Sequence, residues 1–153
     1  MKNTFLLILL IPFSIIAMAQ EKKDFSLSFN HMALSVKDVK VSAEFYTKVL
    51  NLEIIPSSLK YDDTRWISMG EGKELHLVSY VAGEIKTNKA IHLALSTTNF
   101  DAFVQRLTTM KIEYGDFPGT INKINVRSDG IKQVFFQDPD GYWIEVNSIN
   151  NSK

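Results

Sequence analysis

The sequence predicts an α+β fold of two βαβββ modules whose mixed sheets curve into a cup around a metal site. Three observations support this prediction. A strand-like motif at His31–Ser35 recurs at His92–Ser96. Each copy is followed by a helix-like stretch and then by three strand-like runs, so the repeat extends over both halves of the chain. The three histidines of the chain and Glu145 all fall in the first or last strand of a half.

The first residues have the features of an export signal. Lys2 precedes an apolar run at Phe5–Ile16, and Ala17-Met18-Ala19 is a small-x-small cleavage signature. The run is short for a transmembrane helix, and an uncleaved membrane anchor is the alternative. We therefore expect a signal peptide cleaved near Ala19 and a periplasmic or secreted protein. The expected parts are a signal peptide at 1–19, a tail at 20–27 and one domain at 28–149, with module one at 28–81 and module two at 90–149.

The first strand of each module has the alternation of a half-buried strand. In module one Met32 and Leu34 share a face, and His31 lies on the opposite face. The same holds in module two, where Leu93 lies opposite His92. Both histidines are therefore predicted to point away from the apolar face.

A helix is predicted after each of these strands. In module one Asp38 is a candidate N-cap, and Phe45 and Tyr46 have the spacing of core residues. In module two Asn99 or Asp101 is the candidate cap. The predicted apolar stripes are Val41, Phe45, Val49 and Leu50 in module one, and Phe103, Leu107 and Met110 in module two.

Three further strands are predicted in each half. They are Glu53 to Leu59, Thr64 to Met69 and Glu74 to Tyr80, then Ile112 to Phe117, Ile131 to Gln137 and Tyr142 to Asn147. Turns are expected at Gly70–Gly72 and Asp138–Gly141. A polar insertion from about Pro118 to Gly130 is expected to be a surface loop.

The composition excludes several classes of function. The chain is 45% hydrophobic and 22% charged, as in a globular protein. Without the export segment it has 16 basic and 17 acidic residues, and no basic cluster. Nucleic acid and an acidic membrane surface are therefore not expected partners. There is no cysteine, so stability must come from the core rather than from disulfides.

The repeat places four metal-binding side chains in equivalent positions. His31 corresponds to His92, and alignment of the last strands sets His76 against Glu145. Imidazole and carboxylate are the donors that Zn²⁺, Ni²⁺, Fe²⁺ and Mn²⁺ accept. Glu74 shares a strand face with His76 and is the alternative ligand. The sequence thus predicts one divalent metal ion held by His31, His76, His92 and Glu145.

The chain resembles the vicinal oxygen chelate superfamily, which includes glyoxalases, bleomycin-resistance proteins and extradiol dioxygenases. Its last strand is most similar to that of glyoxalase I-like proteins, in which an Asp-Pro-Asp-Gly turn precedes Tyr-Trp-Ile-Glu and the glutamate binds the metal. This chain differs from the glyoxalase I pattern at His76, where glyoxalase I usually has a carboxylate. The segments that carry the resemblance are Asn30–Val36, Glu44–Leu52, Ile91–Leu95 and Phe135–Val146.

The resemblance implies a glyoxalase-like lyase or isomerase that acts on a vicinal-oxygen small molecule through an enediolate-type intermediate. Glu145 would be both metal ligand and catalytic base. Two alternatives are a metal-dependent iron dioxygenase and a non-catalytic binding or resistance protein of the same fold. Arg65, Trp66 and Trp143 are the predicted substrate contacts. The resemblance also implies a homodimer, with the site either within one chain or shared across two.

Overall fold

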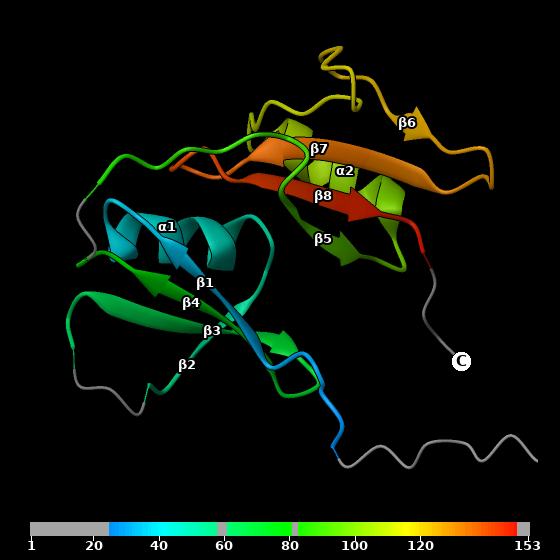
Figure 1. The fold of residues 1–153 in the computed structure, drawn as a ribbon. Coiled ribbons are helices and arrows are strands. Elements are labelled where there is room, and N and C mark those ends of the chain that lie inside the picture. Colours follow the sequence, from blue (N-terminus) through cyan, green and yellow to red (C-terminus); the bar gives the residue numbers. More distant parts are fainter. Residues whose placement is uncertain (1–24, 58–60, 81–82, 150–153) are drawn as a thin grey trace, which may run out of the picture.

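The computed structural model describes residues 25–57, 61–80 and 83–149 (Figure 1). The predicted signal peptide at 1–19 lies outside these residues. None of the described helices is long and apolar enough to cross a membrane. In chain order the elements are β1 (His31–Ser35), α1 (Val39–Lys48), β2 (Glu53–Ile55), β3 (Thr64–Gly70), β4 (Lys73–Val78), β5 (His92–Ser96), α2 (Phe100–Thr109), β6 (Asn125–Val126), β7 (Lys132–Gln137) and β8 (Trp143–Asn147).

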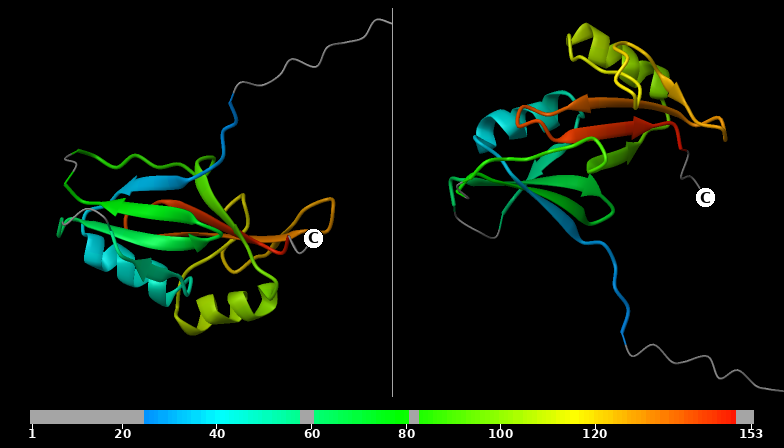
Figure 2. Two further views of the ribbon diagram at one scale, coloured as in Figure 1. Left: turned by 90° about the horizontal axis from the view of Figure 1, so that it is seen from below. Right: turned by 45° about the horizontal axis from the view of Figure 1, so that its top comes forward.

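The strands form two four-stranded mixed sheets, one from each half of the chain (Figures 1 and 2). Their orders are β1-β4-β3-β2 and β5-β8-β7-β6, with the first and last strands of each module paired in parallel. The register repeats as well, since Ala33 pairs with His76 and Ala94 pairs with Glu145. The predicted α+β fold with two βαβββ repeats is therefore confirmed. Within the described residues the two sheets stay separate and do not close into a barrel.

Each helix begins at a side chain that caps it. The Asp38 carboxylate accepts hydrogen bonds from the backbone amides of Lys40 (2.7 Å) and Val41 (3.4 Å). In α2 the cap is Asn99, whose side chain accepts from the Ala102 amide at 3.2 Å. These bonds satisfy amides that have no partner in the first turn of a helix. Of the two candidates in module two, Asn99 is therefore the cap.

The apolar stripe predicted for α1 is partly wrong. Tyr46 is fully buried and Val49 is buried, as expected, but Val41 is 51% exposed. The buried face runs instead through Val39, Ala43 and Tyr46. These residues have the i, i+4, i+7 spacing of one helix face, and Val41 lies off that face. Met110, at the end of α2, is also exposed.

The two modules share one core and are joined by the turn at Asp138–Gly141. The Tyr46 hydroxyl of α1 donates a hydrogen bond to the Asp138 carboxylate at 2.9 Å. The Ser42 hydroxyl donates to Asp140 at 2.8 Å. Nearby, the Phe136 ring packs against Phe45 of α1 at a centroid distance of 6.4 Å. The turn thus fixes module two on the helix of module one.

The edge of the second sheet differs from the prediction. Ile112 to Phe117 is not a continuous strand, because only Gly115 forms isolated bridges, to Phe135 and Ile121. The edge strand is β6, which lies inside the insertion expected to be a surface loop. The chain turns after Gly115 because the Asp116 carboxylate accepts hydrogen bonds from the amides of Gly119 (2.9 Å) and Thr120 (2.7 Å).

Candidate functional site

His31 and His76 lie together on the outward face of the first sheet. Their rings stack at a centroid distance of 4.2 Å, with 11° between the planes. Trp66 of β3 stacks on the other side of His76 at 4.3 Å. The three rings are therefore nearly parallel, and His76 lies in the middle. We call His31 and His76 the first half-site.

Hydrogen bonds orient both rings of the first half-site. The side-chain oxygen of Asn30 lies 2.7 Å from Nδ1 of His31. Nε2 of His31 does not take part in this hydrogen bond. The Glu74 carboxylate lies 2.7 Å from Nε2 of His76. Glu74, the alternative ligand in the sequence, is thus the hydrogen-bond partner of the predicted ligand. Partners of this kind set the tautomer and orientation of a metal-binding histidine.

His92 and Glu145 form the corresponding pair on the second sheet. Nε2 of His92 lies 3.2 Å from Oε2 of Glu145. The other carboxylate oxygen, Oε1, accepts hydrogen bonds from the amide groups of Gln133 (2.7 Å) and Asn147 (2.8 Å). Glu145 is only 6% exposed, and burying a carboxylate without partners is costly. The two amides hold Oε1, so Oε2 is the oxygen presented to His92. We call this pair the second half-site.

Lys89 supports the second half-site through both its backbone and its side chain. Its carbonyl oxygen lies 2.9 Å from Nδ1 of His92. Because a carbonyl oxygen only accepts, Nδ1 donates this hydrogen bond, and Nε2 is the ring nitrogen that faces Glu145. Its ammonium group donates to the carbonyl oxygens of Asp116 (3.3 Å) and Phe117 (3.1 Å). The same nitrogen lies 4.1 Å from the centre of the Trp143 ring, a cation–π distance.

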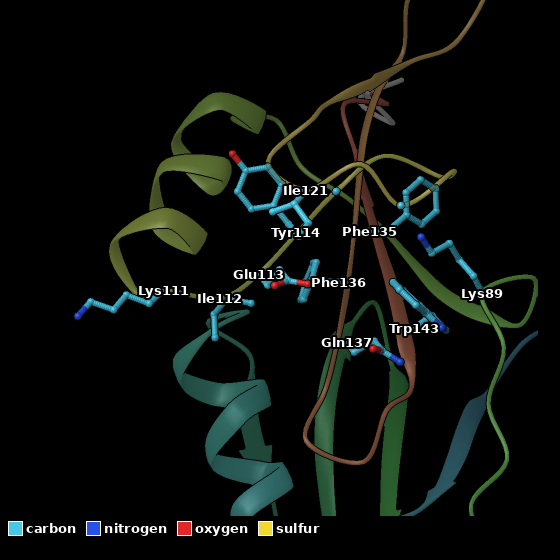
Figure 3. Close-up of a pocket in the computed structure, with 12 residues that line it drawn as sticks. Lys89, Lys111, Ile112, Glu113, Tyr114, Ile121, Phe135, Phe136, Gln137 and Trp143 are labelled. Carbon is cyan, nitrogen blue, oxygen red and sulfur yellow. The ribbon is translucent and has the colours of Figure 1, made fainter.

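A cavity of about 280 Å³ lies beside this half-site (Figure 3). Lys89 extends into it near Phe135 and Trp143, and Gln137 lines another side. Phe135 pairs with Glu145 across β7 and β8, so the cavity is one residue away from the carboxylate. It has both aromatic surface and a cationic group, as small-molecule sites commonly do.

The four predicted metal ligands thus fall into two pairs in this chain. Among the described residues there is no group of three or more histidine, cysteine, aspartate or glutamate side chains arranged to hold a metal ion. Each pair has donors suited to a divalent transition metal, but two donors are fewer than the three or four protein ligands that such ions usually take. The two half-sites are equivalent in register and separate in space.

The predicted substrate contacts have different environments. Trp66 is part of the ring stack, and Trp143 lines the cavity beside the second half-site. Arg65 pairs with buried Leu77 on the other face of β3, and its guanidinium donates to the carbonyl oxygens of Asp62 and Thr64. A substrate contact of Arg65 stays a prediction.

Two supporting residues were not identified as such from the sequence. Gln133 could have been found from the pairing of the last two strands, since it lies opposite Asn147 and on the same face as Glu145. The sequence contains no pattern that indicates a role for Lys89, because that role depends on its backbone carbonyl and on the fold of the insertion. Asn147 lies two residues after Glu145 on β8 and its side-chain amide donates to the Glu145 carboxylate.

Comparisons with known proteins agree with this fold. Residues 28–146 match the Glyoxalase/Bleomycin resistance protein/Dioxygenase superfamily. Glyoxylase I 4 of Arabidopsis thaliana is 30% identical over 129 residues, which cover 78% of this chain and 69% of that protein. A lactoylglutathione lyase of Pseudomonas putida is 24% identical over 152 residues, which cover 77% of this chain and 83% of that protein. The crystal structure of a putative glyoxalase family protein from Bacillus anthracis superimposes with a TM-score of 0.66 at 22% identity, covering 84% of this chain and all (100%) of that one. The chain therefore belongs to the glyoxalase, bleomycin resistance protein and dioxygenase superfamily.

Proposed function

We propose that this protein is an exported metal-dependent lyase or isomerase of the glyoxalase type. Its substrate would be a small molecule with two adjacent oxygens. The metal site would be made by two copies of the chain, with His31 and His76 from one copy and His92 and Glu145 from the other. The observation that carries the proposal is the division of four equivalent donors into two outward-facing pairs, neither of which makes a site alone.

The chemistry of the donors fits a divalent transition metal. Three imidazoles and one carboxylate are ligands for Zn²⁺, Ni²⁺, Fe²⁺ or Mn²⁺. Nδ1 of His92 is hydrogen-bonded to the Lys89 carbonyl, and Nε2 faces Glu145, the other predicted ligand of this half-site. Metal-binding histidines commonly have this arrangement. When bound, the ion would polarise the two substrate oxygens and stabilise negative charge on them.

Glu145 would move the proton in the reaction. Its Oε1 is held by Gln133 and Asn147, so rotation of the carboxylate is restricted, and Oε2, which faces His92, is the oxygen left to accept the proton. The cavity lined by Trp143 and Phe135 adjoins the strand pair that carries Glu145, and we place the substrate at the junction of this cavity and the second half-site. A positioned base of this kind typically contributes about 10²–10⁴-fold to the rate.

Metal analysis tests the site. The chain is purified without chelator, and its metal content is measured beside that of His92→Ala and of Ile91→Ala, an exposed neighbour that serves as control. We expect about one ion per chain in the wild type and in Ile91→Ala, since a two-fold dimer has two such sites. We expect loss of the ion in His92→Ala. Absence of metal from all three proteins would contradict the proposal and favour a binding protein.

Turnover tests the reaction. The substrate is the hemithioacetal of a small thiol and an α-ketoaldehyde, with Glu145→Gln as the inactive comparison. Turnover by the wild type without oxygen uptake, together with a fall of about 10²-fold or more in Glu145→Gln, is the expected result. Equal turnover in the two proteins would contradict the role of Glu145.

An iron dioxygenase is the second candidate, and the contacts of His76 favour it. His76 lies between Trp66 and His31 and is bonded to Glu74, so it has partners of its own without a metal. If His76 remains unbound, two histidines and one carboxylate are left, the facial triad of non-haem iron oxygenases. Oxygen consumption that depends on added Fe²⁺ and a catechol would identify this activity.

A further inference from the structure

The segment before β1 exposes a row of large apolar side chains. Phe25, Leu27 and Phe29 are 75%, 90% and 62% exposed and alternate with serines. Figures 1 and 2 show this segment, in blue, leaving the body of the molecule at the start of β1. We call residues 25–30 the arm. Such a row is unfavourable in water and is typical of a surface that binds another protein.

The arm continues the strand that carries His31. The Asn30 carbonyl accepts a hydrogen bond from the Glu74 amide at 3.1 Å, so the pairing of β1 with β4 extends one residue into the arm. β4 begins at Lys73, directly after the turn from β3, and the arm extends beyond the end of this sheet. Only Asn30 of the arm makes this pairing, and residues 25–29 belong to no strand of the described chain. Phe29 precedes His31 by two residues, so the apolar row begins directly beside the first half-site.

The second half-site has a matching apolar rim. The His92 ring meets the Phe135 ring edge-on at a centroid distance of 5.7 Å, and Phe135 meets Phe117 edge-on at 5.5 Å. Phe117 and Ile121 are both exposed on the segment that follows Gly115. A line of aromatic surface thus leads away from His92. Alternate residues of an extended arm would lie about 7 Å apart, a spacing similar to that between these ring centroids.

We infer that the arm of one copy packs on the second module of another copy, with Phe25, Leu27 and Phe29 against Phe117, Ile121 and Phe135. This inference rests on the proposed shared site, because that site brings His31 of one copy opposite His92 of the other. The arm then closes the rim around both half-sites. The occupant is a second copy because the arm leads directly from a half-site that the described residues of one chain leave incomplete.

Sedimentation velocity tests the contribution of the arm to dimer formation. The full-length chain is expressed so that any processing of its first residues occurs, and the purified protein is treated with chelator so that metal makes no contribution. The triple variant Phe25→Ser, Leu27→Ser, Phe29→Ser is compared with Val41→Ser, Ile54→Ser, which loses exposed apolar side chains elsewhere. We expect the dimer dissociation constant to rise at least about 10-fold in the arm variant and to stay unchanged in the control.

Disulfide trapping tests where the arm binds. The natural chain has no cysteine, so a cross-link can form only between introduced residues. Leu27→Cys with Ile121→Cys should form a covalent dimer under mild oxidation. Ser28→Cys with Ile121→Cys, on the opposite face of the arm, should form much less. A triple arm variant with the dimer dissociation constant of the wild type would overturn the inference. Equal cross-linking by the Leu27–Ile121 and Ser28–Ile121 cysteine pairs would overturn it as well.

The two proposals can fail separately. A wild type that binds metal and dimerises, but whose arm variant dimerises equally well, would overturn the inference about the arm and leave the shared site standing. A wild type that binds no metal, but whose arm variant dimerises more weakly, would support the arm and contradict the metal site. A wild type that is monomeric at all concentrations would overturn the inference about the arm.

Discussion

At Asp138, burial and hydrogen bonding act on one carboxylate in opposite directions. Burial is the larger effect and raises the pKa of Asp138 above its ordinary value of 3.8, although the Tyr142 amide and the Tyr46 hydroxyl both donate to the carboxylate. A raised folded-state pKa means that the folded protein binds this proton more tightly than the unfolded chain. The contribution of Asp138 to stability is therefore present at acidic pH and is lost as pH rises through the raised pKa.

The variant Asp138→Asn tests this. An asparagine oxygen still accepts from the amides of Asp140 and Tyr142, and its NH₂ group faces the Tyr46 oxygen. We expect the free energy of unfolding of Asp138→Asn, relative to wild type, to increase as pH rises from about 4 toward neutrality, because the variant does not have to bury a charge. Urea unfolding at several pH values measures the difference. A difference that is constant with pH would contradict the prediction.

The individual site residues were predictable to different degrees. The repeat sets His31 against His92 and His76 against Glu145, and the strand register agrees with that alignment. That these residues bind a metal stays a prediction. Their division into two pairs was not predictable. Alternation tells which face of a strand a side chain occupies, but not how one sheet is oriented relative to the other. That orientation depends on buried contacts between the modules.

At the scale of the elements, strong local signals were the reliable ones. Both helices were predicted because each follows a capping side chain and has helical spacing of apolar residues. The edge strand of the second sheet was mispredicted because its position depends on one turn. Asp116 binds the amides of two following residues, and the chain leaves the sheet there and returns as β6. Apolar alternation through Ile112 and Tyr114 gave no sign of that turn.

The cap of α1 can be tested directly. Asp38 accepts hydrogen bonds from two amides, and Asp38→Ala leaves both without a side-chain partner. We expect a loss of about 1 kcal/mol in the free energy of unfolding. Asp38→Asn is the matched control, because its side-chain oxygen retains the cap, and it should lose much less. Thermal or urea unfolding gives both values, and equal losses in the two variants would exclude capping as the cause.

At the scale of the whole molecule, the two modules are fixed to each other by buried and partly buried polar contacts. The Tyr142 hydroxyl donates to the Ser35 carbonyl at 2.9 Å, and Arg106 of α2 donates to the Val49 carbonyl at the end of α1 at 2.9 Å. With the Tyr46–Asp138 bond, these contacts connect both helices and the last turn to the opposite module. Bringing the two half-sites of one chain together would break them, whereas a second copy can meet each half-site with the modules left in place.

Mixed dimers give a decisive test of the shared site. One variant carries His31→Ala and His76→Ala, and the other carries His92→Ala and Glu145→Gln. Each alone should bind no metal, because each lacks one half of every site. A mixed dimer, isolated through different affinity tags, should bind one ion per dimer, about half of the wild-type content, since one of its two sites has all four donors. A mixed dimer without metal would mean that all four donors of a site belong to one chain, which would require the modules to separate at the Tyr46–Asp138 contact.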